Sequence, residues 1–420
     1  MHVLMFGWEL PPHNSGGLGT ACEGLLRGFR DQDVFFTFVL PRRVSLAPSS
    51  PNAKIVFAED AASLGGLKWP DASAYASPDG ERAAFGLLEE VRRYALWAGQ
   101  MASELHFDII HAHDWLSFGA GMAAREATGK PLVVHVHATE FDRTGGAGVN
   151  QTVYDIEREG MERADRIIAV SNYTKDTIVR RYGIPPEKIA VVHNGVTVEE
   201  SKPPPRQKRR SARLDAVETS AKSEPLPLDL SALKRSGAKL VLFLGRITLQ
   251  KGPDYFLKAA QGVLAIEPNV YFILAGSGDM ERQMILQAAR AGISDRVIFA
   301  GFVRGNERTA LYRAADLYIM PSVSEPFGIA PLEAMAEGTP VLISKQSGVS
   351  EAVRHALKVD FWDTDEMVNK IIGVLRSPAL TATLRVRGKN EARKNTWERA
   401  AEKVYSVYRS ILDYIREISI

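Results

Sequence analysis

The sequence predicts an α/β protein with two parallel-sheet domains, and three observations support this fold class. Short apolar runs of strand length alternate with segments of helical spacing through both halves of the chain. The 420 residues exceed the usual size of one hydrophobic core. A basic, proline-rich stretch over 201–237 separates the halves and is typical of a linker or insertion. We therefore expect an N-terminal domain over 1–200 and a C-terminal domain over 238–399.

Composition limits the function. Hydrophobic residues at 45% and charged residues at 24% are ordinary values for a globular protein. The net charge of +2 argues against a general binder of nucleic acid or of membrane surfaces. A single cysteine, Cys22, excludes an internal disulfide framework and a cysteine-based metal cluster. Because no apolar run approaches the roughly 20 residues of a membrane span, and no signal-peptide pattern begins the chain, we expect a soluble, cytoplasmic protein.

In the first half, each predicted strand runs into a polar or glycine-rich segment. Strands are predicted over 3–6, 108–110, 131–136, 166–170 and 189–192, and helices over 20–29, 82–105, 157–164 and 172–182. Residues 42–80 lack periodicity and are expected to form a surface excursion with short strands. Gly16 and Gly17 lie between the first strand and the first helix, where free backbone N–H groups can face an anion. A plain tight turn explains such a loop equally well, and the dinucleotide-binding spacing of glycines is absent.

Polar side chains follow two further strands of this half, at the edge where parallel sheets bind ligands. His111, His113 and Asp114 follow the strand at 108–110, and His137 follows the strand at 131–136. No third metal ligand is spaced close to the first two histidines, so we expect no metal there. A lone histidine is more often structural than catalytic, but the polar loop around His137 favours a role in a site.

The second half opens with a strand over 239–244, and the glycine-bounded loop after it carries Arg246 and Lys251. An arginine can bind phosphate through two hydrogen bonds and a lysine supplies a compact charge, so the two could offset a leaving nucleoside diphosphate. The alternative is a pair of solvated surface cations. Further strands are predicted over 271–275, 297–300, 317–320 and 339–343, and helices from 254, over 333–337 and over 397–415.

The loop after the strand at 317–320 carries the main functional prediction. Glu325 and Glu333 bracket it, with Phe327 and Gly328 between them. Free N–H groups at the start of the following helix favour an anion, and carboxylates accept hydrogen bonds from vicinal hydroxyls. This combination predicts a nucleotide-sugar site, whereas the alternative is a capped core helix beside a solvated glutamate.

The Glu325-x7-Glu333 motif and the Arg246–Lys251 loop resemble the donor site of retaining glycosyltransferases of the GT-B fold, namely family 4 and the related glycogen and starch synthases. The resemblance covers nearly the whole chain outside 42–80 and 200–237. It implies two Rossmann-like domains facing a cleft, with the last helix, 400–420, packed back on the first domain. It also implies a hexosyltransferase that needs no metal or other cofactor. The nucleotide-sugar donor would bind mainly the second domain, and the carbohydrate acceptor the first.

The resemblance also implies roles for individual residues. Catalytic roles fall to Arg246, Lys251, Glu325 and His137, donor contacts to Gly16, Gly17, Gly301, Phe302, Phe327, Gly328, Ile329 and Glu333, and acceptor contacts to His113 and Asp114. Glu325 would hold hydroxyls of the transferred sugar and Glu333 the ribose. Retention in this family is ascribed to front-side attack, in which the donor phosphate takes the acceptor proton, so no protein nucleophile is expected.

The substrate prediction depends on two segments, 111–115 and 137–143, which resemble the glucan-synthase side of the family. They imply transfer of glucose from UDP- or ADP-glucose to an α-1,4-glucan such as glycogen. Asn14 replaces the synthases' donor-binding lysine, which favours UDP-glucose or a relaxed donor choice. A small sugar or sugar-phosphate acceptor, as in sucrose- or trehalose-type enzymes, is an open alternative. A nucleotide-sugar epimerase and a non-catalytic sugar-nucleotide sensor of the same fold are two more. Neither nucleic acid nor a membrane is expected as a partner.

Overall fold

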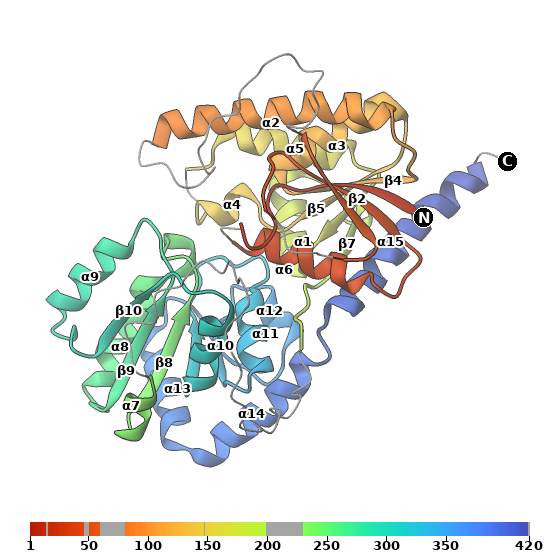
Figure 1. Cartoon of the computed structure of the whole chain (residues 1–420). Coiled ribbons are helices and arrows are strands. Elements are labelled where there is room, and N and C mark those ends of the chain that lie inside the picture. The colour runs from red at the N-terminus through yellow and green to blue at the C-terminus, as the bar shows by residue number, and fades with distance from the viewer. Residues whose placement is uncertain (14–15, 46–49, 59–79, 147, 199–229, 419–420) are drawn as a thin grey trace, which may run out of the picture.

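The computed structural model describes residues 1–13, 16–45, 50–58, 80–146, 148–198 and 230–418, which form two parallel sheets with helices on both faces (Figure 1). The first sheet has the strand order β3-β2-β1-β4-β5-β6-β7, and the second has the order β10-β9-β8-β11-β12-β13. Every strand pairs in parallel with its neighbours. The predicted class, α/β with two parallel sheets, is confirmed.

The first sheet is built entirely from the first half of the chain. Its strands are β1 His2–Phe6, β2 Phe35–Leu40, β3 Ala53–Phe57, β4 Ile109–His113, β5 Leu132–Val136, β6 Arg166–Ala169 and β7 Ile189–Val191. Strand β2 was not predicted. Strand β4 extends further than the predicted strand, so His111 and His113 lie within it rather than after it. The reason is the two-residue period of a strand, which places Ile109 and both histidines on one face of the sheet.

Helices cover both faces of the first sheet. They are α1 Gly17–Gly28, α2 Gly80–Ser103, α3 Trp115–Thr128, α4 Glu140–Arg143, α5 Gln151–Arg163 and α6 Asn172–Thr177, with a π-helical turn Ile178–Tyr182 and a 3₁₀ turn Pro186–Lys188. One face packs against α2, α3 and α5, and the other against α1. Helix α5 begins earlier than predicted because the side chain of Asn150 accepts hydrogen bonds from the N–H groups of Thr152 and Val153.

The second sheet has the same organisation. Its strands are β8 Lys239–Leu244, β9 Val270–Ala275, β10 Val297–Gly301, β11 Leu317–Met320, β12 Val341–Ser344 and β13 Leu357–Val359. Its helices are α7 Leu230–Arg235, α8 Pro253–Leu264, α9 Glu281–Arg290, α10 Gly305–Ala314, α11 Ile329–Ala336, α12 Val349–Ala352, α13 Thr364–Arg376 and α14 Pro378–Ala392, with a 3₁₀ turn Leu249–Lys251. Helix α11 starts four residues before the predicted start because Gly328 is its N-cap, which leaves Pro331 in the first turn, where its missing N–H costs nothing.

The last helix, α15 Trp397–Ile418, leaves the second half and packs on α1 of the first half (Figure 1). Two glycines of α1 permit this close packing. A Cβ atom on Gly24 would lie 2.1 Å from Trp397 Cε2, and one on Gly28 would lie 2.3 Å from the Trp397 carbonyl oxygen. Any larger residue at these positions would push the two helices apart.

Several predictions fall partly outside the described residues. Of the predicted linker 201–237, residues 201–229 lie outside, and α7 forms most of the remainder, with Lys234 Nζ 2.6 Å from Asp316 Oδ2. Most of the predicted excursion 42–80 and Asn14 also lie outside. Within the described residues, no helix is both long enough and apolar enough to cross a bilayer.

The strand order places the loops that matter for function. In the first sheet β1 lies between β2 and β4, and in the second β8 lies between β9 and β11. The chain turns in opposite directions from β1 and β4, and likewise from β8 and β11, so a crevice opens beyond the carboxyl ends of each pair. The loops after these four strands contain most of the predicted site residues.

Candidate functional site

The loops after β8 and β11 meet at the carboxyl edge of the second sheet. We call them the β8 loop, 245–252, and the β11 loop, 321–328. Lys251 Nζ lies 2.5 Å from Glu325 Oε2, and the Ser322 hydroxyl donates to the same carboxylate at 3.2 Å. The Lys251 side chain is 21% exposed and that of Glu325 is 7% exposed. Lys251 and Glu325, which belong to two separate sequence motifs, therefore form one ion pair at the edge of the sheet.

Arg246 stands at the start of the β8 loop, and its side chain is exposed. It donates a long hydrogen bond, 3.5 Å, to the buried side chain of Gln250. A bond of this length is weak, so the guanidinium group keeps most of its capacity to bind an anion.

The N-terminus of α11 faces out of the β11 loop. Its N-cap, Gly328, has φ +97°, and an added Cβ would lie 3.0 Å from Met320 Cε, so the turn requires glycine. Phe327 is 2% exposed and its ring lies 5.8 Å from that of His193, so this residue can offer a ligand only its backbone. Ile329, the first residue of α11, packs against the apolar clusters of both halves.

Glu333 is fixed by two residues that sequence reasoning missed. Tyr312 donates its hydroxyl to Oε2 at 3.0 Å, and Arg308 Nη1 lies 3.2 Å from Oε1. Burial raises the pKa of Glu333, and the charge of Arg308 opposes that shift. Arg308 and Tyr312 are four residues apart on α10 and therefore lie on one face of it. This spacing was the available signal, but no helix was predicted there.

The first half holds the β11 loop in place. Ser171 Oγ and Thr174 Oγ1 donate to the carbonyl oxygen of Pro326 at 2.5 and 3.2 Å. Ser324 Oγ donates to Asp142 Oδ1 at 2.6 Å. Ser171 is also the N-cap of α6, where its hydroxyl accepts from the Thr174 N–H. The fold gives it a second contact, because α6 begins at the boundary between the halves.

A further contact between the halves is centred on Glu351. Its Oε1 accepts from the Asn172 N–H at 2.6 Å and lies 2.7 Å from His193 Nε2. Burial acts to raise the pKa of Glu351, but the hydrogen bonds from His193 and Asn172 outweigh burial and lower it. The carboxylate therefore stays ionised and ties α12 to the first half.

Gly301 and Phe302 lie where β10 ends. Gly301 has φ +66°, and the ring of Phe302 is 52% exposed. Arg304 Cζ lies 4.5 Å from the centroid of that ring, and Arg304 Nη1 donates to the Pro12 carbonyl oxygen at 2.9 Å. The exposed ring is thus held beside the loop that follows β1.

Gly16 and Gly17 begin α1 in that same loop. Gly16 is the N-cap and Gly17 is exposed, and an added Cβ at either would meet no atom of the described residues within 4 Å. Glu9 Oε1 accepts from the Gly19 N–H at 3.2 Å. Open space beside the first turn leaves room for a ligand at this helix start.

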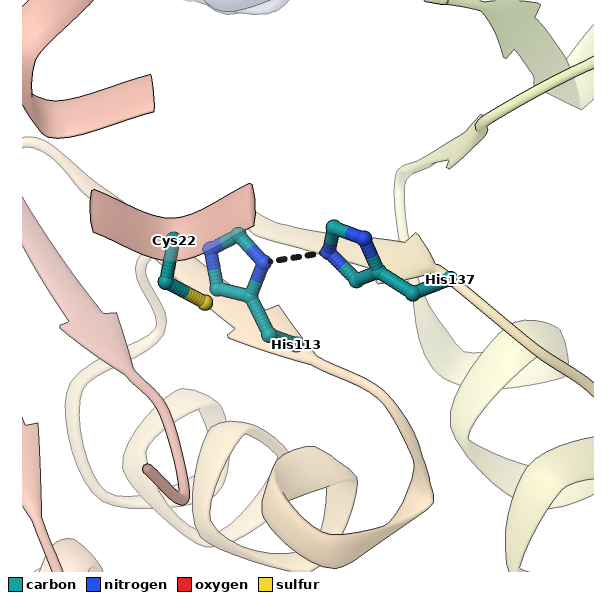
Figure 2. A group of neighbouring side chains, drawn as sticks. All are labelled: Cys22, His113 and His137. Carbon is teal, nitrogen blue, oxygen red and sulfur yellow. Dashed lines mark hydrogen bonds between the residues drawn. The ribbon is translucent and has the colours of Figure 1, made fainter. Parts of the chain in front are cut away.

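His137 is the histidine of this edge that reaches the surface. Its Nε2 lies 2.9 Å from Nδ1 of His113, which is fully buried (Figure 2). Burial lowers the pKa of His137 and of His111 to about 3, so both rings are neutral at physiological pH. Spacing along the chain offered no third metal ligand for His111 and His113. The fold supplies one, because His135 of the neighbouring strand joins them.

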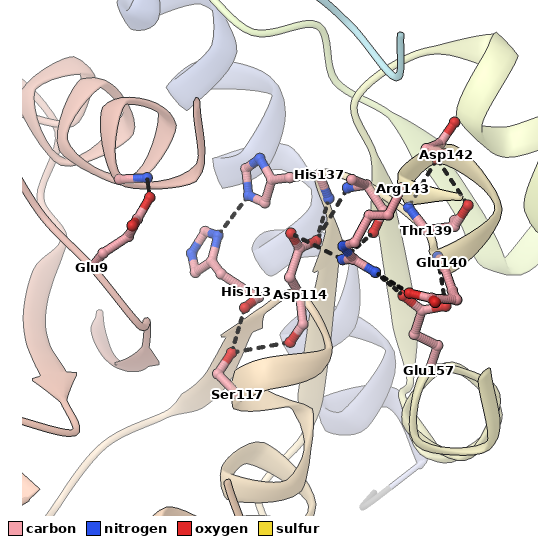
Figure 3. A network of polar contacts seen from close by, with 12 residues as sticks. Glu9, His113, Asp114, Ser117, His137, Thr139, Glu140, Asp142, Arg143 and Glu157 are labelled. Carbon is pink, nitrogen blue, oxygen red and sulfur yellow. Dashed lines mark hydrogen bonds and ion pairs between the residues drawn. The ribbon is translucent and has the colours of Figure 1, made fainter. Parts of the chain in front are cut away.

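Asp114 positions the backbone around His137 rather than facing solvent (Figure 3). Its Oδ1 accepts from the N–H groups of His137 at 2.6 Å and of Ala138 at 3.3 Å. It is a non-glycine residue with φ +57°, a strained conformation that turns β4 into α3. Burial raises the pKa of Asp114 to about 7, against the opposing charge of Arg143, whose Nη2 lies 3.9 Å from Oδ2.

Arg143 connects Asp114 to two further acids (Figure 3). Its Nη1 lies 2.8 Å from Glu157 Oε1 and 3.5 Å from Glu140 Oε2. Burial raises the pKa of Glu157, and Arg143 opposes that shift. The cluster therefore consists of three buried acids around a part-exposed arginine, and it fixes the loop that carries His137.

Comparison with known proteins supplies the family. A model described as glycosyl transferases group 1 matches residues 230–395, and one described as glycosyltransferase family 4 matches residues 15–200. A D-inositol 3-phosphate glycosyltransferase of Catenulispora acidiphila is 30% identical over 330 residues, which cover 74% of this chain and 73% of that protein. The chain belongs to glycosyltransferase family 4.

Other similar proteins match nearly the whole length of this chain. An uncharacterized glycosyltransferase of Methanocaldococcus jannaschii is 26% identical over 434 residues, covering 98% of this chain and 99% of that one. The structure of sucrose-phosphate synthase from Thermosynechococcus elongatus aligns with a TM-score of 0.75 at 20% identity, covering 98% and 99% of the two chains. Anabaena HepE in complex with UDP and glucose aligns with a TM-score of 0.70 at 20% identity, covering 98% and 100%. The predicted GT-B fold and the predicted enzyme class, a hexosyltransferase, are confirmed.

The predicted site residues of this glycosyltransferase fall into two groups. The first group lies at or near the surface of the two carboxyl edges and consists of the second-half residues together with Gly16, Gly17 and His137. Within this group, only the side chains of Glu325 and Phe327 are buried. His113 and Asp114, predicted to contact the acceptor, are 0% and 6% exposed. Their acceptor role stays a prediction, and the contacts observed are internal to the protein.

Proposed function

We propose that this family 4 glycosyltransferase transfers a glucosyl group from a nucleoside diphosphate sugar to a hydroxyl of a small, phosphate-bearing acceptor. Transfer proceeds with retention of configuration and without a metal ion. The observation that carries this proposal is the Lys251–Glu325 ion pair beside the free N-terminus of α11. It combines a cation for the leaving group with a carboxylate for sugar hydroxyls in one place.

The leaving diphosphate carries two negative charges that must be stabilised as the glycosidic bond breaks. Exposed Arg246 and part-exposed Lys251 supply two positive charges, and the first N–H groups of α11 add hydrogen bonds. The Lys251 ammonium has three donors and uses one toward Glu325, so it can bind phosphate oxygen without losing its partner.

The two glutamates suit hydroxyl groups. Glu325 is held by Lys251 and Ser322, and Glu333 by Arg308 and Tyr312, so neither carboxylate must be reoriented to accept from a ligand. We assign Glu325 to the transferred sugar and Glu333 to the ribose. The exposed ring of Phe302 and the backbone of Gly301 are assigned to the base.

The donor proposed first is UDP-glucose, with ADP-glucose second. Support comes from the structural similarity to HepE, which is described in complex with UDP and glucose. Since that protein is 20% identical, the similarity establishes the fold, and donor identity rests on the assay below.

The small acceptor is favoured by the burial of the residues that suggested a glucan. His113, Asp114 and Trp115 are 0%, 6% and 5% exposed, so they form internal contacts rather than a surface for a polymer. The names of two similar proteins, sucrose-phosphate synthase and D-inositol 3-phosphate glycosyltransferase, both contain a phosphorylated small molecule. An α-1,4-glucan is the second candidate, supported by the resemblance of 111–115 and 137–143 to glucan synthases.

A donor–acceptor screen tests this proposal. Purified protein is incubated with radiolabelled UDP- or ADP-glucose and, separately, with fructose 6-phosphate, inositol 3-phosphate, glucose, maltose or glycogen. We expect label in a phosphorylated small acceptor, and an α-linked product by NMR. Label that enters only glycogen would overturn the small-acceptor proposal. Release of nucleoside diphosphate only when acceptor is present separates a transferase from an epimerase and from a silent sensor.

A further inference from the structure

Four histidines stack on the face of the first sheet that α1 and α15 cover. They are His111 and His113 of β4, His135 of β5, and His137 directly after β5. The ring centroids are 4.3 Å apart for His111 and His113, and 4.2 Å apart for His135 and His137. The family resemblance implies a catalytic role for His137 and an acceptor contact for His113, and it gives no role to His111 or His135.

Several nitrogens of this stack have no hydrogen-bond partner among the described residues. They are Nε2 of His111, Nε2 of His113, and both ring nitrogens of His135. All three side chains are 0–3% exposed. Unpaired buried nitrogens are unfavourable, and clusters of them in native proteins call for a ligand, an ion or ordered water.

The only cysteine of the chain lies against this stack. Cys22 is on α1 and fully buried, and Figure 2 shows the His113 ring between Cys22 and His137. One ligand atom from each of these three residues lies within 4.8 Å of the other two, and His111, His113 and His135 satisfy the same criterion. Ligands of one tetrahedral zinc ion are about 3.5 Å apart, so modest side-chain rotations close the gap.

We propose that Cys22, His113 and His137 form a binding site for a thiophilic divalent metal ion, of which Zn²⁺ fits best. One thiolate and two imidazoles are donors that zinc prefers over oxygen-seeking ions such as Mg²⁺. Three protein ligands leave a fourth coordination position on the part-exposed side of His137, open to water or a small ligand. Binding displaces the thiol proton of Cys22 into solvent, whereas the two imidazoles coordinate as neutral rings.

Metal at this site regulates transfer rather than taking part in it. This consequence rests on the proposed function together with the catalytic role that the family resemblance implies for His137. A ring that coordinates zinc is no longer free to line the sugar site, so bound metal inhibits transfer. Chelation removes the inhibitor and does not remove a catalytic group.

Cobalt titration of the metal-free protein tests the site directly. Because Cys22 is the only cysteine, a thiolate-to-cobalt charge-transfer band in the near ultraviolet can come only from this residue. We expect one equivalent of Co²⁺ to produce the band, Zn²⁺ to abolish it, and proton release to accompany binding. A chromogenic chelator then gives the zinc affinity by competition.

Two variants and a control make the titration decisive. Cys22→Ala, which preserves helix propensity, should abolish the band and weaken zinc binding at least tenfold, and His137→Gln should weaken it similarly. His355→Asn, a part-exposed histidine of the second half paired with Glu391 at 2.9 Å, should leave both measurements unchanged. Circular dichroism verifies folding of each variant.

The proposal is overturned by the absence of a charge-transfer band in folded wild-type protein, or by equal zinc affinity in wild type and Cys22→Ala. The failure of the proposed function has a different signature, because a protein without transfer activity would still show the cobalt band. Where transfer is measurable, zinc should inhibit the wild type and inhibit Cys22→Ala at least tenfold more weakly.

Discussion

The carboxyl edges of the two sheets use charge in different ways. At the first sheet, the buried carboxylates of Asp114 and Glu157 pair with Arg143, whose side chain is 22% exposed, and burial raises the pKa of both acids. At the second sheet, Lys251 pairs with the buried Glu325 in a similar way, and the difference lies in Arg246, which is exposed. Buried, mutually satisfied charges fix a shape, whereas exposed charges with spare hydrogen-bonding capacity bind a ligand. We therefore infer that the charges of the first edge hold the loops in position and that those of the second edge bind a ligand.

This contrast predicts that the first edge controls pH-dependent stability. The pKa of Asp114 is about 7 in the folded protein and near 3.8 unfolded, so the folded state holds a proton that the unfolded state releases. Its contribution to stability is complete below pH 3.8 and is lost as pH rises through 7. In urea unfolding, wild type should lose up to about 4 kcal/mol relative to Asp114→Asn between pH 4 and pH 8.

The matched control for Asp114→Asn is Asp155→Asn, at an exposed position on α5. The stability difference between wild type and this control should stay near zero across the same range. A parallel pH profile for wild type and Asp114→Asn would contradict the assignment of Asp114 to a buried, proton-holding position.

At the second edge, removing the exposed charge of Arg246 should affect turnover and not stability, whereas Lys251→Ala should also lower stability because it leaves the buried Glu325 carboxylate without its cation. Arg246→Ala or Lys251→Ala should lower kcat by about a hundredfold, because each removes a group that stabilises the leaving diphosphate. Lys258→Ala, 54% exposed on α8, is the matched control and should retain wild-type turnover. Wild-type rates in both site variants would contradict the assignment of these residues to the diphosphate. Loss of thermal stability in Arg246→Ala would contradict the difference between the two edges.

The contact between the two edges should have an intermediate effect. Ser324→Ala removes the hydrogen bond to Asp142 that ties the β11 loop to the first half. Hydrogen bonds to charged groups contribute about 1.5–3 kcal/mol, so kcat/KM should fall about tenfold. Ser350→Ala, whose hydroxyl donates to the Lys345 carbonyl oxygen within the second half, should change kcat/KM little. Equal effects of the two substitutions would show that the link between the halves does not position the loop.

The smallest expected effect is that of metal removal on transfer. The proposed reaction needs no metal ion, because cationic side chains and helix N–H groups stabilise the leaving diphosphate. Adding EDTA to the assay should leave turnover at or above its initial value. A loss that Mg²⁺ or Mn²⁺ restores would contradict the metal-free mechanism.

Much of the fold was predictable because it is encoded locally. The apolar runs at Lys239–Leu244 and Leu317–Met320 form strands with the predicted bounds. Strand β2 was missed although Phe35–Leu40 is an apolar run of strand length. Strand β4 was predicted to end before His111 because histidines in a polar context do not indicate a strand. Burial and pairing with β1 and β5 impose the strand conformation there.

The candidate site divides in the same way. The motifs containing Arg246, Lys251, Glu325 and Glu333 are local, since each lies in a single strand-to-helix loop or the helix turn after it. Some partners lie in the same loop, as Gln250 does for Arg246 and Ser322 for Glu325, but others are remote or on another element. Glu333 meets Arg308 and Tyr312 of the preceding helix, and Ser324 meets Asp142 across 182 positions of sequence.

The sequence by itself determined the α/β class, the two parallel sheets and the loops that carry the donor motifs, because hydrophobic period and turn residues act over a few neighbouring positions. Only the tertiary structure decided which loops meet and which polar groups are buried. It placed Cys22 beside His113, and it placed His111 Nδ1 2.5 Å from the Tyr408 hydroxyl, 297 positions away. Such contacts depend on strand order and on the helices that cover each face, and no local pattern specifies these.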